Sequence, residues 1–180
     1  MASALFTAQI QGLTDSVEAS SAGVAGDVSP GREVPEEVLE VMAPYGIDLR
    51  SHRSRQLTEP MLARSDLIVG LARRHVQEAV LLDPPCWPKA FTLKELVRRG
   101  STVGPRRPDQ GVRSWIDSVH GDRSRTSLAH RSSTDDVADP YGGSLARYRA
   151  SAVEVAKLVA QLVELIWPVG GLGPTAGPGA

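Results

Sequence analysis

An acidic side chain on a tight turn is the feature of this sequence best suited to acid–base chemistry. Asp139 precedes Pro140 and is followed by Tyr141, Gly142 and Gly143. A residue before proline is pushed out of the α region, and glycine permits the positive φ of a sharp turn. We therefore expect the carboxylate to project from the loop, where it could donate or accept a proton. The same pattern is also typical of a plain turn.

The chain has one cysteine, Cys86, which is the first candidate for a nucleophile. It lies among prolines, with no glycine-rich turn or helix start behind it, and the residue six positions later is Thr92 rather than an arginine. A thiol without a cationic neighbour or a helix N-terminus stays protonated near neutral pH. We therefore expect a packing or surface role for Cys86. A single cysteine also favours a reducing, cytoplasmic compartment.

Histidines and arginines are the remaining candidates for binding chemistry. Arg53 and Arg55 could bind an anion, although exposed ion pairs with neighbouring acids are more typical. The arginines of segments 106–107 and 123–125 alternate with aspartates, which predicts a solvated loop of mixed charge. The four histidines show no metal-ligand spacing with one another or with Cys86, so neither a metal nor a cofactor is expected. They are His52, His75, His120 and His130, and the first two are expected to hydrogen-bond locally beside helix starts.

Composition limits the class of protein. The 180 residues, 41% of them hydrophobic, are enough for one α/β domain with a real core. The net charge of −1 gives no argument for a nucleic-acid partner or an anionic membrane surface. No run of about 18 apolar residues is present, so no membrane span is expected. These features predict a soluble, cytosolic protein.

Hydrophobic patterns predict the elements that would position the acid. Strands are expected at 17–23, 66–71 and 89–93, the second covered on both faces because its apolar residues do not alternate. Helices are expected at 1–13, from 34 to about 43, from 58, at 75–82, at 94–99, around Trp115, and from Ser144 onward. Strands that alternate with helices favour a parallel sheet with helices on both faces.

The final helix carries the clearest apolar stripe, with residues recurring every three or four positions. They are Leu145, Tyr148, Ala152, Val155, Val159, Leu162 and Ile166. Before this helix, a polar insertion runs over about residues 100–134. After it, a Gly/Pro-rich tail at 168–180 is expected to be disordered. The sequence thus predicts one α/β domain over residues 1–167.

Five short pieces occur in an order that resembles a known family. They are Met1–Phe6, Ser20–Gly23, Gly46–Leu49 with Ser51–Leu57, Asp66–Val69 and Asp139–Gly143. In this order they resemble the low-molecular-weight protein tyrosine phosphatase family, over about residues 1–99 and 136–167. The resemblance implies a three-layer α/β/α fold around a small parallel sheet of strand order 2-1-3-4.

The resemblance also implies a mechanism. A cysteine thiolate attacks phosphorus and forms a phosphocysteine, and an aspartic acid protonates the leaving oxygen and later activates water. That aspartate matches Asp139, and Tyr141 matches an aromatic that forms a wall of the substrate cleft. The implied substrate is a phosphotyrosine protein or a small phosphomonoester.

One part of the family pattern has no match in this sequence. The family begins with a strand, a cysteine, five residues, an arginine and Ser-Pro, ahead of the helix that matches Met1–Phe6. The first strand, a central one, and the nucleophile loop are thus missing. We expect the 180-residue chain to be inactive as given, and Met1 to be an internal methionine of a longer natural chain. A GC-rich composition, with only three lysines among twenty basic residues, favours that expectation.

Two alternatives remain open from the sequence. The first is an arsenate reductase on the same fold that passes oxidation to an external thiol, because Cys86 alone offers no internal relay. The second is a non-catalytic binding module or remnant that uses its helical faces and the segment 100–134. The sequence gives no signal for an oligomeric state.

Overall fold

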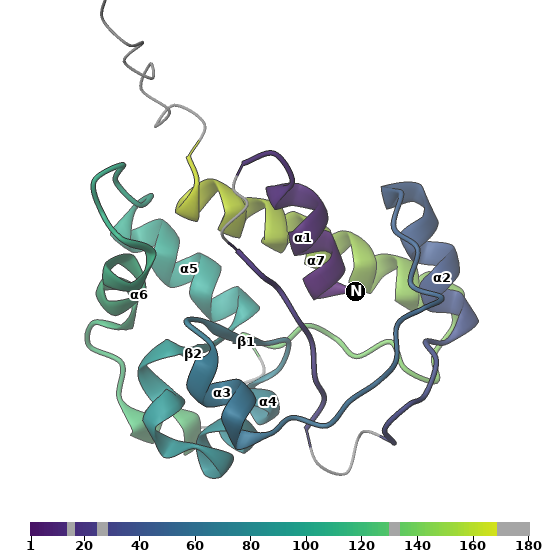
Figure 1. Ribbon diagram of the computed structural model, residues 1–180, viewed down its shortest axis with the longest axis horizontal. Coiled ribbons are helices and arrows are strands. Elements are labelled where there is room, and N and C mark those ends of the chain that lie inside the picture. Colours follow the sequence, from purple (N-terminus) through teal and green to yellow (C-terminus); the bar gives the residue numbers. More distant parts are fainter. Residues whose placement is uncertain (14–16, 25–28, 130–133, 169–180) are drawn as a thin grey trace, which may run out of the picture.

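The computed structural model describes residues 1–13, 17–24, 29–129 and 134–168. At its centre lies a parallel two-stranded sheet of β1 (Ile68–Gly70) and β2 (Ala90–Thr92), with Val69 opposite Phe91. Helices cover both faces of this sheet, so the fold is a three-layer α/β/α arrangement (Figure 1). Strands alternate with helices along the chain, as the hydrophobic patterns predict.

The helices of the two outer layers differ in length and position. One layer holds the long α7 (Leu145–Ile166) with α1 (Ala2–Ile10), α2 (Glu36–Met42) and α5 (Leu93–Val103) packed against it. The other layer holds α3 (Glu59–Arg64), α4 (Arg73–Leu82) and the 3₁₀ helix η2 (Pro84–Lys89). The remaining helices are η1 (Ala43–Tyr45), α6 (Val112–His120) and η3 (Arg125–Ala129). None of these helices is long and apolar enough to cross a membrane.

Two buried clusters lie on opposite faces of the sheet. Alternation along β2 sends Phe91 into the larger cluster under α7 and Ala90 into the smaller one with Cys86. The stripe expected on the last helix is confirmed, because every member after the partly buried Leu145 is buried in the larger cluster. These two clusters fix the sheet that carries the loops of the site.

Several predicted boundaries differ from the structure. The helix expected from residue 34 begins at Glu36, and the one expected at 94–99 extends to Val103. The strand expected at 66–71 is limited to Ile68–Gly70, and its expected double coverage is wrong at Val69, which is 39% exposed. Of the tail expected to be disordered, residues 169–180 lie outside the described residues.

The prediction of a strand at 17–23 is wrong. The structure gives this segment a single parallel bridge, between Gly23 and Gln56, rather than a strand ladder. Gly23 donates to the carbonyl of Arg55 at 2.9 Å, and Leu57 donates to the carbonyl of Gly23 at 2.7 Å. Alternation of apolar and polar residues predicts an extended backbone, but a ladder also needs a neighbouring strand. Among the described residues, none pairs with 17–22.

The polar segment after residue 100 is also more tightly packed than its composition predicts. Its helix α6 buries Trp115, Ile116 and Val119 against α5, and the indole N–H of Trp115 donates to the carbonyl of Gly104 at 2.9 Å. Arg123, expected to be solvated, is only 2% exposed and is paired with Glu95 at 2.8 Å. The chain returns here to the start of β2, where Arg123 donates to the carbonyl of Ala90, and this contact explains how a charged residue becomes buried.

Candidate functional site

The turn that bears Asp139 lies between the sheet and the start of α7. One carboxylate oxygen of Asp139 accepts the backbone N–H of Tyr141 at 3.0 Å, and Gly143 donates to the carbonyl of Pro140 at 2.8 Å. Gly142 has a φ of 71°, a conformation that favours glycine. The side chain of Asp139 is 62% exposed. The carboxylate therefore projects from a hydrogen-bonded turn, as its place before proline predicts.

The residues just before this turn tie it to the sheet. Val137 is buried, and its N–H donates to the carbonyl of Leu71 at 2.8 Å. The carboxylate of Asp136 accepts the backbone N–H of Arg73 at 2.7 Å, in the first turn of α4. Lys94 donates to the carbonyl of Asp136 at 2.7 Å. The position of Asp139 is thereby set by β1, α4 and α5 together.

Asp135 adds a charged anchor next to these contacts. Its side chain is 12% exposed and lies 3.2 Å from the guanidinium of Arg98 and 3.6 Å from that of Arg73. A buried carboxylate is costly unless it is paired, and two arginines pair this one. Local sequence patterns do not distinguish Asp135 or Asp136, because the partners of these two residues lie about 40 to 60 residues away along the chain.

Asp136 can be tested as the anchor of the turn. Asp136→Ala removes the acceptor at the first turn of α4, so we expect a loss of about 1 kcal/mol in the free energy of unfolding. Amide hydrogen exchange should also rise at Val137 and through the Asp139 turn. The matched control is Asp109→Ala, because the Asp109 side chain is 80% exposed. Unchanged exchange at Val137 in Asp136→Ala would contradict an anchoring role.

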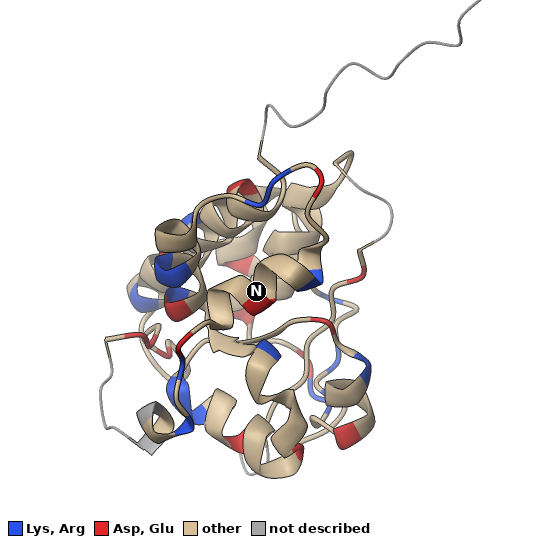
Figure 2. Cartoon of the chain, turned by 90° about the vertical axis from the view of Figure 1, so that its left-hand side faces the viewer, with Lys and Arg blue, Asp and Glu red and all other residues tan. Residues whose placement is uncertain are grey.

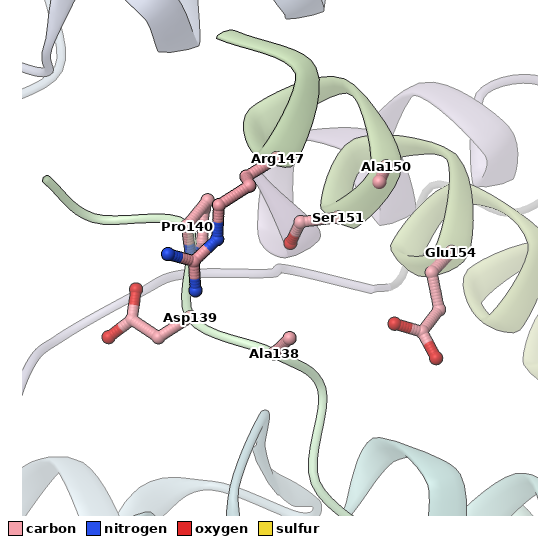
Figure 3. A pocket seen from close by; sticks show the side chains of 7 residues that line it. All are labelled: Ala138, Asp139, Pro140, Arg147, Ala150, Ser151 and Glu154. Carbon is pink, nitrogen blue, oxygen red and sulfur yellow. The ribbon is translucent and has the colours of Figure 1, made fainter. Parts of the chain in front are cut away.

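Two arginines lie near the carboxylate of Asp139. Arg74, on α4, lies 3.3 Å from it. Arg147, on α7, packs over the turn: a Cβ added at Gly143 would meet its Cδ at 2.9 Å. Figure 3 shows the Arg147 guanidinium directed toward Asp139, with Glu154 on the far side of a shallow pocket. This pocket of about 140 Å³ is lined by Ala138, Asp139, Pro140, Arg147, Ala150, Ser151 and Glu154.

Tyr141 lies on the outer side of the same turn and is 66% exposed. Its hydroxyl accepts a hydrogen bond from Arg32 at 3.5 Å. The backbone N–H of Arg32 donates to the hydroxyl of Ser54 at 2.9 Å, and Ser54 donates its own N–H to the carbonyl of Arg32. The loop at residues 29–34 therefore reaches the acid turn through Arg32 and is itself held by Ser54 of the segment 51–57.

Charges of both signs are interspersed over this protein rather than separated into faces of one sign (Figure 2). Arg53 is paired with Glu33 at 2.8 Å, which confirms the exposed ion pair expected for it. His75 accepts the N–H of Ala72 at 3.2 Å, a local bond as expected. His52 differs from expectation, because it follows a turn and no helix begins beside it. Among the described residues, no cluster of three or more His, Cys, Asp or Glu could hold a metal ion.

Cys86 belongs to a different part of the protein. It is fully buried in the smaller cluster, on the α3–α4 side of the sheet, whereas the acid turn follows Val137 of the larger cluster. Burial raises the pKa of its thiol to about 11, and the nearby Asp83 carboxylate acts in the same direction. Cys86 is thus separated from the acid turn and is held in the protonated form.

Comparisons with known proteins agree with this architecture. Probable low molecular weight protein-tyrosine-phosphatase EpsP of Ralstonia nicotianae is 35% identical over 96 residues, which are 53% of this chain and 62% of that relative. The protein-arginine-phosphatase of Bacillus subtilis is 28% identical over 166 residues, 91% of this chain and 85% of that protein. The crystal structure of a low molecular weight protein tyrosine phosphatase from T. tengcongensis superimposes with a TM-score of 0.65 at 30% identity, covering 91% of this chain and 87% of that one.

The family itself follows from the match over residues 1–102 to the sequence profile of low molecular weight phosphotyrosine protein phosphatases. This match spans more than half of the 180 residues and includes both strands and α1 to α4. The chain belongs to the low molecular weight phosphotyrosine protein phosphatase family.

Proposed function

We propose that this chain provides the general-acid side of a site that hydrolyses phosphomonoesters, with Asp139 as the acid. The observation that carries the proposal is the exposed Asp139 carboxylate on a turn anchored to the sheet by Asp136 and Val137. A general acid needs a fixed position and access to the leaving group. Asp139 has both, and family membership supplies the reaction class.

The neighbouring acids are poorer candidates for this role. Asp135 is buried between two arginines, and Asp136 accepts the first N–H of α4. Both carboxylates are therefore engaged in contacts that stabilise the fold. One carboxylate oxygen of Asp139 accepts a single backbone N–H, and the other oxygen lies 3.3 Å from the guanidinium of Arg74. Because this ion pair is exposed, solvent screens the attraction between the two charges. Tyr141, exposed beside it, would form a wall for the substrate.

The proposed mechanism needs a thiolate to form the phosphocysteine, and Cys86 is not suited to that step. A pKa of about 11 leaves on the order of one thiol in 10⁴ ionised near neutral pH, and the sulfur is buried away from the turn. The family's nucleophile belongs to a cysteine loop that these 180 residues do not include. The 180-residue chain by itself therefore forms no phosphocysteine.

The proposed substrate is a phosphotyrosine protein or a related phosphomonoester. A second candidate is a phosphoarginine protein, because the match to a protein-arginine-phosphatase covers 91% of this chain. In both substrates an acid is needed to protonate the atom that leaves phosphorus. Asp139 would therefore serve either reaction, and the choice rests on the walls of the cleft, where Tyr141 and Arg32 lie.

The test is hydrolysis of p-nitrophenyl phosphate by the 180-residue chain. We expect the rate of hydrolysis to equal the rate in buffer alone, and we expect the Cys86→Ser variant to show the same rate. Hydrolysis above that rate by the folded chain, lost in Asp139→Asn, would show that the nucleophile lies among these residues and would overturn the assignment of Cys86.

A further inference from the structure

A second cavity lies where the segment 17–24 meets the segment 51–57, apart from the pocket behind the acid turn. It has a volume of about 210 Å³ and is lined by Ser21, Ala22, Gly23, His52, Ser54 and Arg55. At roughly 30 Å³ for each water molecule, it has room for several waters or for one small ion. The proposed hydrolysis assigns no role to this cavity.

Hydrogen bonds hold the two sides of the cavity together. Gly23 pairs with Arg55 and Leu57 through the backbone, and the Nε of Arg55 donates to the carbonyl of Ser21 at 2.8 Å. The hydroxyl of Ser54 donates to the carbonyl of Ser29 at 2.6 Å. These bonds hold Arg55 in the lining of the cavity, and among the described residues only the Nε of its guanidinium has a hydrogen-bond partner, so that its two terminal nitrogens can serve a ligand.

The charges around the cavity are positive. The guanidinium groups of Arg55 and Arg53 both act on His52, and of these two only Arg53 is paired with a carboxylate, Glu33, within the described residues. None of the lining residues is acidic. Burial is the first cause that lowers the pKa of His52, and nearby positive charges, among them Arg55 and Arg53, act in the same direction. A cavity with donors and positive charge, but no carboxylate in its lining, favours an anion.

We propose that this cavity binds a tetrahedral oxyanion, either a free phosphate or sulfate ion or the phosphoryl group of an ester. Arg55 supplies charge-assisted hydrogen bonds from its terminal nitrogens, and His52, which also lines the cavity, supplies a ring N–H. Ser21 and Ala22 contribute donors from the edge of the segment 17–24. Binding here requires no catalysis and does not depend on the proposed hydrolysis.

The pH dependence of binding follows from His52. An anion in the cavity favours the imidazolium, so it raises the pKa of His52 relative to the empty protein. Affinity is therefore lowest at a pH well above the bound pKa, rises as the pH falls through it, and levels off below the pKa of the empty protein. Sulfate is the suitable probe, because its own charge is constant between about pH 5 and pH 8, so that a change of affinity in this range reports on the protein.

The test is an NMR titration of the 180-residue chain with sodium sulfate at constant ionic strength. We expect saturable shifts at the amides of Ser21 to Gly23 and at the ring of His52. Arg55→Gln should weaken binding by about tenfold or more, as the loss of a charge-assisted hydrogen bond implies. The matched control is Arg64→Gln on α3, because Arg64 is exposed and lies outside the cavity. Shifts that do not saturate, or equal affinities in Arg55→Gln and Arg64→Gln, would overturn the proposal.

Two further arms keep the result interpretable. His52→Asn should weaken sulfate binding and abolish the rise of affinity at low pH. An unchanged rise of affinity would count against the site. This variant also serves if Arg55→Gln does not fold. Inorganic phosphate and O-phosphotyrosine separate a free ion from an esterified phosphoryl group. Binding of both assigns the cavity to the oxyanion itself, binding of phosphotyrosine alone restricts it to the phosphoryl group of an ester, and binding of neither overturns the proposal. Because only binding is measured, failure here leaves the proposed hydrolysis intact, and absence of hydrolysis leaves this site intact.

Discussion

Arg123→Ala is expected to lower the free energy of unfolding by about 3–5 kcal/mol, the largest stability effect of any single substitution considered for this chain. The Arg123 side chain is 2% exposed, and its guanidinium carbon lies 3.9 Å from the ring centroids of both Trp87 and Phe91. It pairs with Glu95 and donates to the carbonyl of Ala90 at 2.7 Å. Truncation would leave a largely buried carboxylate and a buried carbonyl without their partner.

Urea denaturation of the unmodified protein and of Arg123→Ala measures this loss in the free energy of unfolding. Arg107→Ala is the matched control, because that arginine is 71% exposed and pairs with Asp109 at 3.5 Å, and we expect it to change stability by less than about 0.5 kcal/mol. Similar midpoints for Arg123→Ala and Arg107→Ala would show that the buried guanidinium contributes nothing beyond its exposed counterpart.

Asp139→Asn is expected to have the largest effect on activity. Because we propose that the nucleophile is supplied by a further segment, we consider a joined chain, in which the strand and cysteine loop of the family pattern are fused ahead of Met1. Asparagine keeps the shape of the side chain and can still accept the N–H of Tyr141, but it has no proton to give. We expect kcat of the joined chain to fall by about 10²–10⁴-fold.

The size of this effect should depend on the leaving group. A leaving oxygen of high pKa needs protonation more than one of low pKa, so the loss should be greater for an alkyl phosphate than for p-nitrophenyl phosphate. The matched control is Asp109→Asn, because Asp109 is an exposed acid in a different segment from Asp139. This substitution should leave kcat unchanged. Equal losses for all leaving groups would assign Asp139 a role in binding or folding instead of proton transfer.

Local patterns predicted most of the helices and the acid turn. The stripe from Tyr148 to Ile166 depends only on the period of one helix, and it is buried as expected. The turn at Asp139 depends on Pro140 and Gly142, whose effects on the backbone are also local. The sequence could therefore place the carboxylate on a turn before any partner of that turn was known.

Contacts between distant segments could not be predicted in the same way. Arg123 lies in a polar run and reads as solvated, but its partners Trp87, Phe91 and Glu95 lie about 30 residues earlier. Asp136 similarly anchors the acid turn through Arg73, 63 residues away. For the segment 17–23 the local pattern predicts more structure than is found. Its alternation of apolar and polar residues is clear, but the described residues give it only one β-bridge.

The most direct test of the central claim compares hydrolysis of p-nitrophenyl phosphate by three folded proteins. These are the 180-residue chain, the joined chain, and the joined chain with Asp139→Asn. If this chain holds the acid and lacks the nucleophile, the first hydrolyses no faster than buffer, the second turns over, and the third loses most of that activity. Hydrolysis by the 180-residue chain at the level of the joined chain, or a joined chain indifferent to Asp139→Asn, would contradict the claim.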